Sequence, residues 1–184
     1  MPKRPKPTSY AALLRGINLG RHKRVAMADL RALVEGLGCT DVRSYVQSGN
    51  VVFRSDLGAR DAARAIEHAI ATRLGHDVAV AIRTERQLRD LVANNPFAGS
   101  NVELTSLYVT FLAEKPERSR ARKLAEDSFD PERFEIAGED VYLFFPNGYG
   151  RAKLNNAMLE RQFGVPATTR NWRTVTALAG LTAA

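Results

Sequence analysis

The stretch Tyr10–Phe53, with the sequence YAALLRGINLGRHKRVAMADLRALVEGLGCTDVRSYVQSGNVVF, decides the fold that we predict for this chain. A short apolar run over residues 10–15 is typical of a buried strand. Apolar residues then recur at three- and four-residue steps over 27–37, which indicates one face of a helix. The segment 42–53 contains two strand-like runs on either side of Ser48-Gly49, and this pattern predicts a hairpin.

The following segment completes a first module. Apolar residues share one helical face over 59–74, Gly75 ends that helix, and alternating residues predict a fourth strand over 78–83. The order β-α-β-β-α-β is the ferredoxin-like pattern, which gives a four-stranded antiparallel sheet with both helices on one face. Thr84-Glu-Arg-Gln87 has the spacing of a capping box and predicts the start of a connecting helix, which Asn94-Asn95-Pro96 closes.

The order of elements then repeats at a nearly constant offset. Strands are predicted over 106–112, 133–136, 141–145 and 167–170, helices over 116–127 and 154–163, and a last helix after Asn171. We therefore predict an α+β protein built from two ferredoxin-like modules with antiparallel sheets. The expected segments are a disordered basic tail over 1–8, a first module over 9–83, a connecting helix and linker over 84–104, and a second module with its terminal helix over 105–184.

Composition places the chain among globular proteins. It has 184 residues, of which 45% are hydrophobic and 26% charged. No apolar run approaches the roughly 20 residues that span a bilayer, and the basic N-terminus lacks the apolar segment of a signal peptide. The single cysteine, Cys39, excludes an intramolecular disulfide and is expected to fill space in the interior. We expect a cytoplasmic protein without membrane contact, either monomer or homodimer.

The residues that usually carry catalysis are not arranged in any familiar pattern. The three histidines, His22, His68 and His76, do not have metal-ligand spacing with one another or with Cys39. The chain also lacks a G-x-S-x-G elbow, a P-loop and a G-x-G-x-x-G turn after a strand. We predict no cofactor, no metal and no catalytic residue, and whether the protein is an enzyme stays open.

The strongest positive signal is the basic loop, which we define as residues 15–24 (RGINLGRHKR). It carries four permanent cations and no carboxylate, its glycines allow close approach of the backbone to a ligand, and it leads into a helix N-terminus. Backbone amides and the helix dipole favour an anion there. A solvated loop whose glycines only make a turn is the alternative. The candidate ligand-binding residues are Arg15, Gly16, Asn18, Gly20, Arg21 and Lys23.

A second candidate is the late loop, Asn147–Lys153, which also joins a predicted strand to a helix. Basic residues at a helix start oppose the helix dipole unless an anion is bound, which favours a phosphate or carboxylate site. An ordinary turn is the alternative. The candidate residues are Gly148, Gly150, Arg151 and Lys153.

A third candidate surrounds the only tryptophan. Arg170, Arg173 and Trp172 could stack on a base or another ring, and the candidate ligand-binding residues are Arg170, Asn171 and Trp172. The alternative is a helix that Asn171 caps and whose Trp172 packs in the core. RNA-recognition domains share the predicted order of elements, but their aromatic strand motif is absent from this sequence.

The QSGN turn, Gln47–Asn50, is composed of turn-forming residues. We expect it at the end of the first sheet opposite the basic loop. On that expectation the two segments do not share a site.

Together these motifs resemble a known family. LLRGINLG, KRVAMADLR, YVQSGNVVF, NNPF and ATTRNWRTV occur in the order found in the bacterial domain-of-unknown-function family 1697, from about Tyr10 to Leu181. The resemblance implies two ferredoxin-like halves and no particular reaction. Family members often carry Ser-Lys-x-Thr-Asn at the late helix entry. Here Ala152-Lys-Leu-Asn-Asn156 keeps Lys153 and Asn156 but has neither hydroxyl.

Charge favours an anionic partner without identifying it. The formal net charge is +7, and three of the basic residues lie in the N-terminal tail. Our best prediction is a binding protein for a phosphate-bearing small molecule, such as a nucleotide, or for nucleic acid. A protein-interaction or scaffold protein, or an enzyme of unrecognised type, is the alternative.

Overall fold

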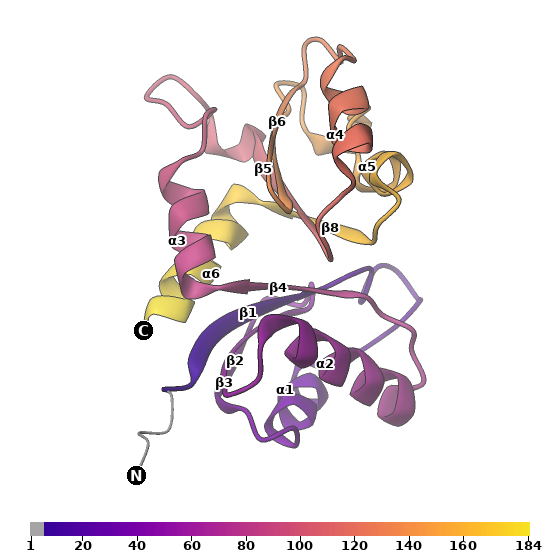
Figure 1. Ribbon diagram of the computed structural model, residues 1–184, viewed down its shortest axis with the longest axis vertical. Coiled ribbons are helices and arrows are strands. Elements are labelled where there is room, and N and C mark those ends of the chain that lie inside the picture. The colour runs from indigo at the N-terminus through magenta and orange to yellow at the C-terminus, as the bar shows by residue number, and fades with distance from the viewer. Residues whose placement is uncertain (1–5) are drawn as a thin grey trace. The chain divides into compact units, whose positions relative to one another are not determined.

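The computed structural model describes residues 6–184 (Figure 1). The chain divides into two compact units. The first contains Met1–Asp90 and Ala177–Ala184, and the second contains Leu91–Thr176. Within the described residues, no helix is both long and apolar enough to cross a membrane.

The first unit has the predicted β-α-β-β-α-β order. Its sheet has the strand order β2-β3-β1-β4, and each neighbouring pair is antiparallel. Both helices lie on one face of this sheet, as Figure 1 shows. Its elements are β1 (Thr8–Leu14), α1 (Met27–Glu35), β2 (Thr40–Tyr45), β3 (Asn50–Ser55), α2 (Ala59–Leu74) and β4 (Val80–Thr84).

β1 is the central element of this sheet because it pairs with β3 on one side and with β4 on the other. Tyr10, Ala12 and Leu14 face the helices and belong to the core that α1 and α2 cover. Ala11 and Leu13 point to the opposite face and are also fully buried. Burial on both faces explains why the strand reads as a continuous apolar run rather than an alternating one.

The last turn of the C-terminal helix α6 (Trp172–Ala183) is tied to the first sheet. Ser9 Oγ donates to the Thr182 carbonyl at 2.7 Å, and the Arg43 guanidinium donates to the Leu181 carbonyl at 3.0 Å. The sequence-based boundaries put the whole helix in the second module, whereas residues 177–184 belong to the first unit. Apolar periodicity within a helix does not reveal which sheet the helix contacts.

The N-terminal boundary also differs slightly from the expected one. The tail predicted over 1–8 falls largely on residues 1–5, which lie outside the described residues. Thr8 already belongs to β1, where it pairs with Ser55 of β3.

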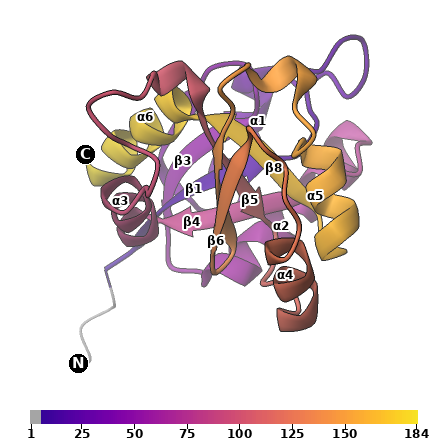
Figure 2. The same cartoon turned by 90° about the horizontal axis from the view of Figure 1, so that it is seen from above.

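The second unit repeats the architecture of the first. Its sheet has the strand order β6-β7-β5-β8, again fully antiparallel, and α4 and α5 lie together on one face, which can be followed from above in Figure 2. The prediction of an α+β fold with two four-stranded antiparallel sheets is therefore confirmed. The elements are β5 (Leu107–Leu112), α4 (Arg118–Ala125), β6 (Arg133–Ala137), β7 (Asp140–Phe144), α5 (Asn156–Phe163) and β8 (Ala167–Asn171).

Two helices of the second unit are shorter than predicted. The helix expected over 154–163 begins at Asn156, because Asn155 is its N-cap and accepts a hydrogen bond from the Met158 amide at 3.0 Å. The helix expected over 116–127 covers only Arg118–Ala125.

Cys39 is buried at the edge of the first core. Burial raises the pKa of its thiol, and a hydrogen bond with Ser55 acts more weakly in the opposite direction. A thiol held in the neutral form is a poor nucleophile, so the side chain fills space as the sequence predicts.

The connecting helix α3 (Glu85–Ala93) begins with the predicted capping box. The Gln87 amide donates to Thr84 Oγ1 at 3.1 Å, and the Thr84 amide donates to Gln87 Oε1 at 2.8 Å. Each side chain therefore satisfies a backbone amide of the other residue.

Replacing Thr84 by alanine removes one half of this box. We expect Thr84→Ala to lower the free energy of unfolding by about 1 kcal/mol, as for other N-cap losses. Urea denaturation followed by circular dichroism measures the change. Thr84→Ser keeps the hydroxyl and should stay within a few tenths of a kcal/mol of the parent; equal losses in both variants would contradict the capping role.

Candidate functional site

The basic loop and the QSGN turn lie against each other at one end of the first sheet. The Leu14 amide donates to the Gly49 carbonyl at 2.8 Å, and Asn18 Nδ2 donates to the Gln47 carbonyl at 2.7 Å. We call residues 15–24 and 46–50, that is, the basic loop and the QSGN turn together with Val46 before it, the loop pair.

The expectation that these segments lie at opposite ends of the sheet is therefore wrong. β1 and β3 are antiparallel, and Leu13 near the end of β1 pairs with Asn50 at the start of β3. The turn that precedes β3 must consequently lie beside the loop that follows β1.

Asn18 is the residue that clamps the loop pair. Its backbone is left-handed, with φ of 54°, and its amide donates to the Lys23 carbonyl at 3.1 Å. Its side-chain oxygen accepts from the Val25 amide at 2.8 Å, while Nδ2 donates to the carbonyls of Val25 and Gln47. Asn18 was a candidate ligand-binding residue, but its side-chain donors are already used within the protein, so it acts by fixing the loop.

The cations of the basic loop have different surroundings. Arg21 and Arg24 are exposed, whereas Arg15 is half-buried and its amide donates to the Ala79 carbonyl at 2.9 Å. Lys23 is half-buried, and its Nζ donates to the Asp77 carbonyl. Arg21 and Arg24 therefore extend into solvent, at the two ends of a short and constrained segment.

The backbone near Gly20 is also accessible. Gly20 is exposed and left-handed, with φ of 63°, and a Cβ there would meet nothing within 4 Å. Among residues 6–184, no carbonyl or side chain accepts a hydrogen bond from the amides of Gly20 and Arg21. These amides and the two exposed guanidinium groups belong to one short segment, and they are the kind of donors that an anion requires.

Two exposed apolar side chains flank the clamp. Leu19, next to Asn18, is 68% exposed, and Val46, next to Gln47, is 52% exposed. Val46 has φ of 50°, a conformation that is costly for a β-branched residue. Sequence reasoning missed both residues, because single apolar residues in loops carry no periodic signal.

Gly49 is required where the two segments touch. It has φ of 79°, and a Cβ at this position would lie 2.6 Å from Cδ1 of the buried Ile17 and 2.9 Å from Cβ of Leu14. Asn50 is fully buried and closes the turn by donating from Nδ2 to the Tyr45 carbonyl at 3.0 Å. The QSGN turn is thus both a hairpin and one wall of the loop pair.

The late loop has a different local structure, because a carboxylate of the chain itself occupies it. Glu132 accepts hydrogen bonds from the amides of Lys153 and Leu154, at 2.8 Å and 2.9 Å. The Asn156 amide donates to the Tyr149 hydroxyl at 3.1 Å. The amides of Lys153, Leu154 and Asn156 are therefore bonded inside the protein. The side chains of Arg151 and Lys153 are exposed, as are Gly148 and Gly150.

Asn156 at this entry has a structural role. Its Nδ2 donates to the Ala167 carbonyl at 2.9 Å, and its Oδ1 accepts from the Thr169 hydroxyl at 3.0 Å. The Thr169 hydroxyl also contacts that of the buried Thr110 at 2.7 Å. This network joins α5 to β8 and β5.

Around the tryptophan, Arg170 and Trp172 are buried, whereas Asn171 is exposed. Trp172 is 6% exposed, and Asn171 caps α6 by accepting from the Thr174 amide at 2.9 Å. Arg170 is 9% exposed, and its guanidinium donates to Thr168 Oγ1 and to the Thr169 carbonyl. Burial lowers the pKa of Arg170 to about 10. The capped helix with a buried tryptophan, which was the alternative interpretation, describes this region.

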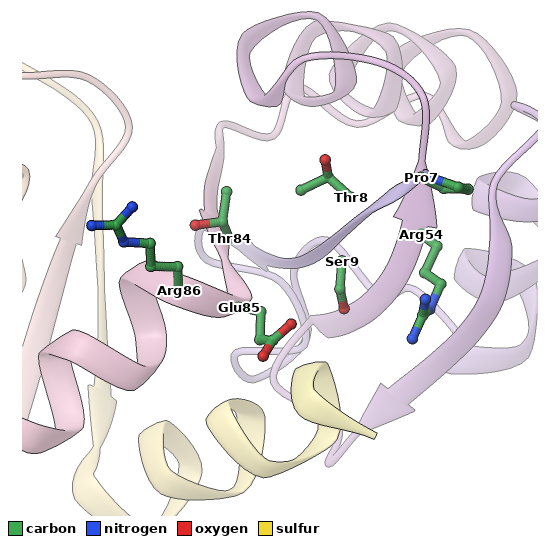
Figure 3. A pocket seen from close by; sticks show the side chains of 7 residues that line it. All are labelled: Pro7, Thr8, Ser9, Arg54, Thr84, Glu85 and Arg86. Carbon is green, nitrogen blue, oxygen red and sulfur yellow. The ribbon is translucent and has the colours of Figure 1, made fainter. Parts of the chain in front are cut away.

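The first unit also has an open pocket of about 390 Å³ at the end of the sheet opposite the loop pair, drawn in Figure 3. Its charged groups have partners within the protein: Arg54 pairs with Asp41 at 3.2 Å, and Glu85 pairs with Arg89 at 3.6 Å. This pocket therefore offers fewer available groups than the loop pair. It is lined by Pro7, Thr8, Ser9, Arg54, Thr84, Glu85 and Arg86.

Metal ligands do not gather anywhere in the part of the chain that the structure describes. No group of three or more His, Cys, Asp or Glu side chains there could hold an ion.

A family model described as "Protein of unknown function (DUF1697)" matches residues 8–142. The chain belongs to this family. The match includes the whole loop pair and ends in β7 of the second unit. A search of curated proteins finds no match.

A solved structure has the same fold as this DUF1697 protein. It is described as the structure of conserved bacterial protein SP0830 from Streptococcus pneumoniae, with a TM-score of 0.78 and 22% sequence identity. The alignment covers 95% of this chain and 98% of that one. At this identity the likeness establishes the fold, and it extends over both units.

Substituting Gly49 tests how closely the loop pair is packed. We expect Gly49→Ala to lower the free energy of unfolding by roughly 2–4 kcal/mol, because the new methyl group both clashes with Ile17 and forces a left-handed alanine. Gly75→Ala is the matched control, because Gly75 also has a left-handed backbone, with φ of 67°, but a Cβ at this position would meet nothing within 4 Å. It should lose only about 1 kcal/mol. Equal losses in urea denaturation would contradict the packing argument.

Removing the carboxylate of Glu132 should open the late loop. We expect Glu132→Ala to cost about 1–3 kcal/mol of stability, because two backbone amides lose their acceptor. Sulfate should then raise the melting temperature of the variant more than that of the parent, because the freed amides can hold an anion. Glu132→Gln, which retains one acceptor oxygen, should fall between the two. A sulfate response identical in all three proteins would contradict this role for Glu132.

Proposed function

We propose that this protein binds a phosphate-bearing ligand, a nucleotide or a nucleic acid strand, at the loop pair, and that it does so in the cytoplasm as a monomer or homodimer. The observation that carries the proposal is the Asn18 clamp. It holds the basic loop in a fixed shape through hydrogen bonds to Val25 and Gln47, while Arg21 and Arg24 remain exposed.

Preorganisation makes this arrangement suitable for binding. A loop that is already ordered loses little conformational entropy when a ligand arrives, so more of the contact energy appears as affinity. Three left-handed residues other than glycine lie in the loop pair: Asn18, Lys23 and Val46. Strained backbone of this kind concentrates at functional sites.

The chemistry of the available groups supports an anion. Guanidinium groups match phosphate oxygens with paired donors, and the amides of Gly20 and Arg21 can add backbone donors. The first acidic residue after the loop is Asp29, in the first turn of α1. The net charge of +7 favours approach of polyanions over the whole surface.

A comparison of the two glycine loops also supports the basic loop. In the late loop, Glu132 already supplies the negative charge that the backbone amides favour. In the basic loop, the hydrogen-bond acceptors for the backbone amides are neutral groups, namely backbone carbonyls and the side chain of one asparagine. Among the described residues, no ion pair compensates the positive charge of Arg21 and Arg24.

Removing the two exposed arginines tests the proposal. We expect Arg21→Ala/Arg24→Ala to weaken binding of inorganic pyrophosphate, ADP and a short oligonucleotide by roughly tenfold or more, since two charge-assisted contacts are lost. Isothermal titration calorimetry at low salt measures the affinities. For the oligonucleotide, the slope of log K against log salt should also become shallower.

The matched control removes two exposed arginines from α4. Arg118→Ala/Arg122→Ala lowers the net charge by the same amount without touching the loop pair. It should change affinity by less than about twofold if binding is local rather than a response to net charge. Equal losses in the two double variants, or no measurable binding by the parent, would contradict the proposal.

A further inference from the structure

Apolar side chains and cations share the surface of the loop pair. Four large hydrophobic side chains are exposed in the described chain: Leu19 at 68%, Val46 at 52%, Leu57 at 40% and Leu104 at 60%. Single exposed apolar residues are ordinary on protein surfaces. Two of these four, however, occur in one pair of loops, beside the exposed Arg21 and Arg24.

The clamp joins the two segments that carry these apolar residues, which are distant in the sequence. Leu19 follows Asn18 and Val46 precedes Gln47, and the side chain of Asn18 donates to the Gln47 carbonyl at 2.7 Å. Each apolar residue is therefore one position from the same hydrogen bond. Leu19 lies in the basic loop and Val46 lies directly before the QSGN turn, so a ligand that contacts both must extend across the clamp.

This combination matches one form of phosphate ligand better than others. In a single strand of nucleic acid, phosphates repeat along the chain and unstacked bases offer apolar faces beside them. A duplex hides those faces within its stack. A mononucleotide has a single base, whereas the loop pair offers apolar contacts on two segments. Apolar side chains can contact an unstacked base, and arginine planes can stack on it.

An anionic membrane is the other surface that combines negative charge with apolar material. Stable adsorption on a membrane requires a continuous apolar face that sinks into the headgroup region. Leu19 and Val46 are only two exposed apolar side chains, on separate segments. The apolar residues of α1, which follows the loop, are buried in the core: Met27, Leu30, Leu33 and Val34. The charge and the small apolar area fit a nucleic acid strand better.

Resting on the function proposed above, we infer that the loop pair binds single-stranded nucleic acid, with Arg21 and Arg24 contacting phosphates and with Leu19 and Val46 contacting unstacked bases.

The test compares ligands and variants of the full chain. Fluorescence anisotropy is measured with a labelled 12-nucleotide oligo-U or oligo-dT and with a duplex of the same length, and pyrophosphate is titrated by calorimetry. Leu19→Ser/Val46→Asn removes both apolar contacts, and asparagine tolerates the left-handed backbone at position 46. We expect the single strands to bind about tenfold more weakly to this variant, with pyrophosphate binding unchanged.

The control and the outcomes separate this inference from the function on which it rests. Leu57→Ser/Leu104→Ser removes the other two exposed apolar side chains and should leave single-strand affinity unchanged. Three results would overturn the inference even if the parent binds pyrophosphate. The parent could bind the duplex as tightly as the single strand, or it could prefer anionic vesicles to oligonucleotides. The Leu19→Ser/Val46→Asn variant could bind single strands as tightly as the parent does. If the parent protein does not bind pyrophosphate, the proposed function itself is overturned.

Discussion

The antiparallel pairing of β1 with β3 is the interaction on which the rest of the first unit depends. β1 is buried on both faces and bonded on both edges, so its position is fixed by more contacts than that of a sheet-edge strand. Its direction relative to β3 brings the basic loop beside the QSGN turn, and the Asn18 clamp can form only there. The shape of the candidate site is thus a consequence of strand direction. The exposed arginines lie in a loop whose conformation is fixed by the sheet and by the clamp.

The two units show how one architecture can have different local chemistry. Each has a glycine-containing loop between a strand and a helix, but an asparagine fixes one loop and a glutamate fills the other. The basic loop follows the first strand of its unit, whereas the late loop follows the third strand of the other, so the two loops are not equivalent positions of the repeat. The backbone arrangement makes a loop available, and a few side chains determine whether it remains open to a ligand.

Most of the fold could be predicted from the sequence because the signals were local. Helical periodicity, the Thr84–Gln87 capping box and the glycines at turns identified the elements in order. The site was harder, because its defining contacts join residues far apart in the chain. The bond from Asn18 to Gln47 and the carboxylate of Glu132 at the late loop left no local pattern. The placement of the QSGN turn was predictable from the antiparallel sheet, but our expectation placed the turn at the wrong end of that sheet.

The division of the chain has a consequence for its synthesis. Residues 177–184 complete the first unit, and their carbonyls accept hydrogen bonds from Ser9 and Arg43 across the whole of the second unit's sequence. A growing chain that has emerged only through Asp90 still lacks these acceptors, so Ser9 and Arg43 can form these hydrogen bonds only after the second unit has been translated. These contacts of the first unit therefore form only after the residues of the second unit have been made, and they join segments of very large sequence separation.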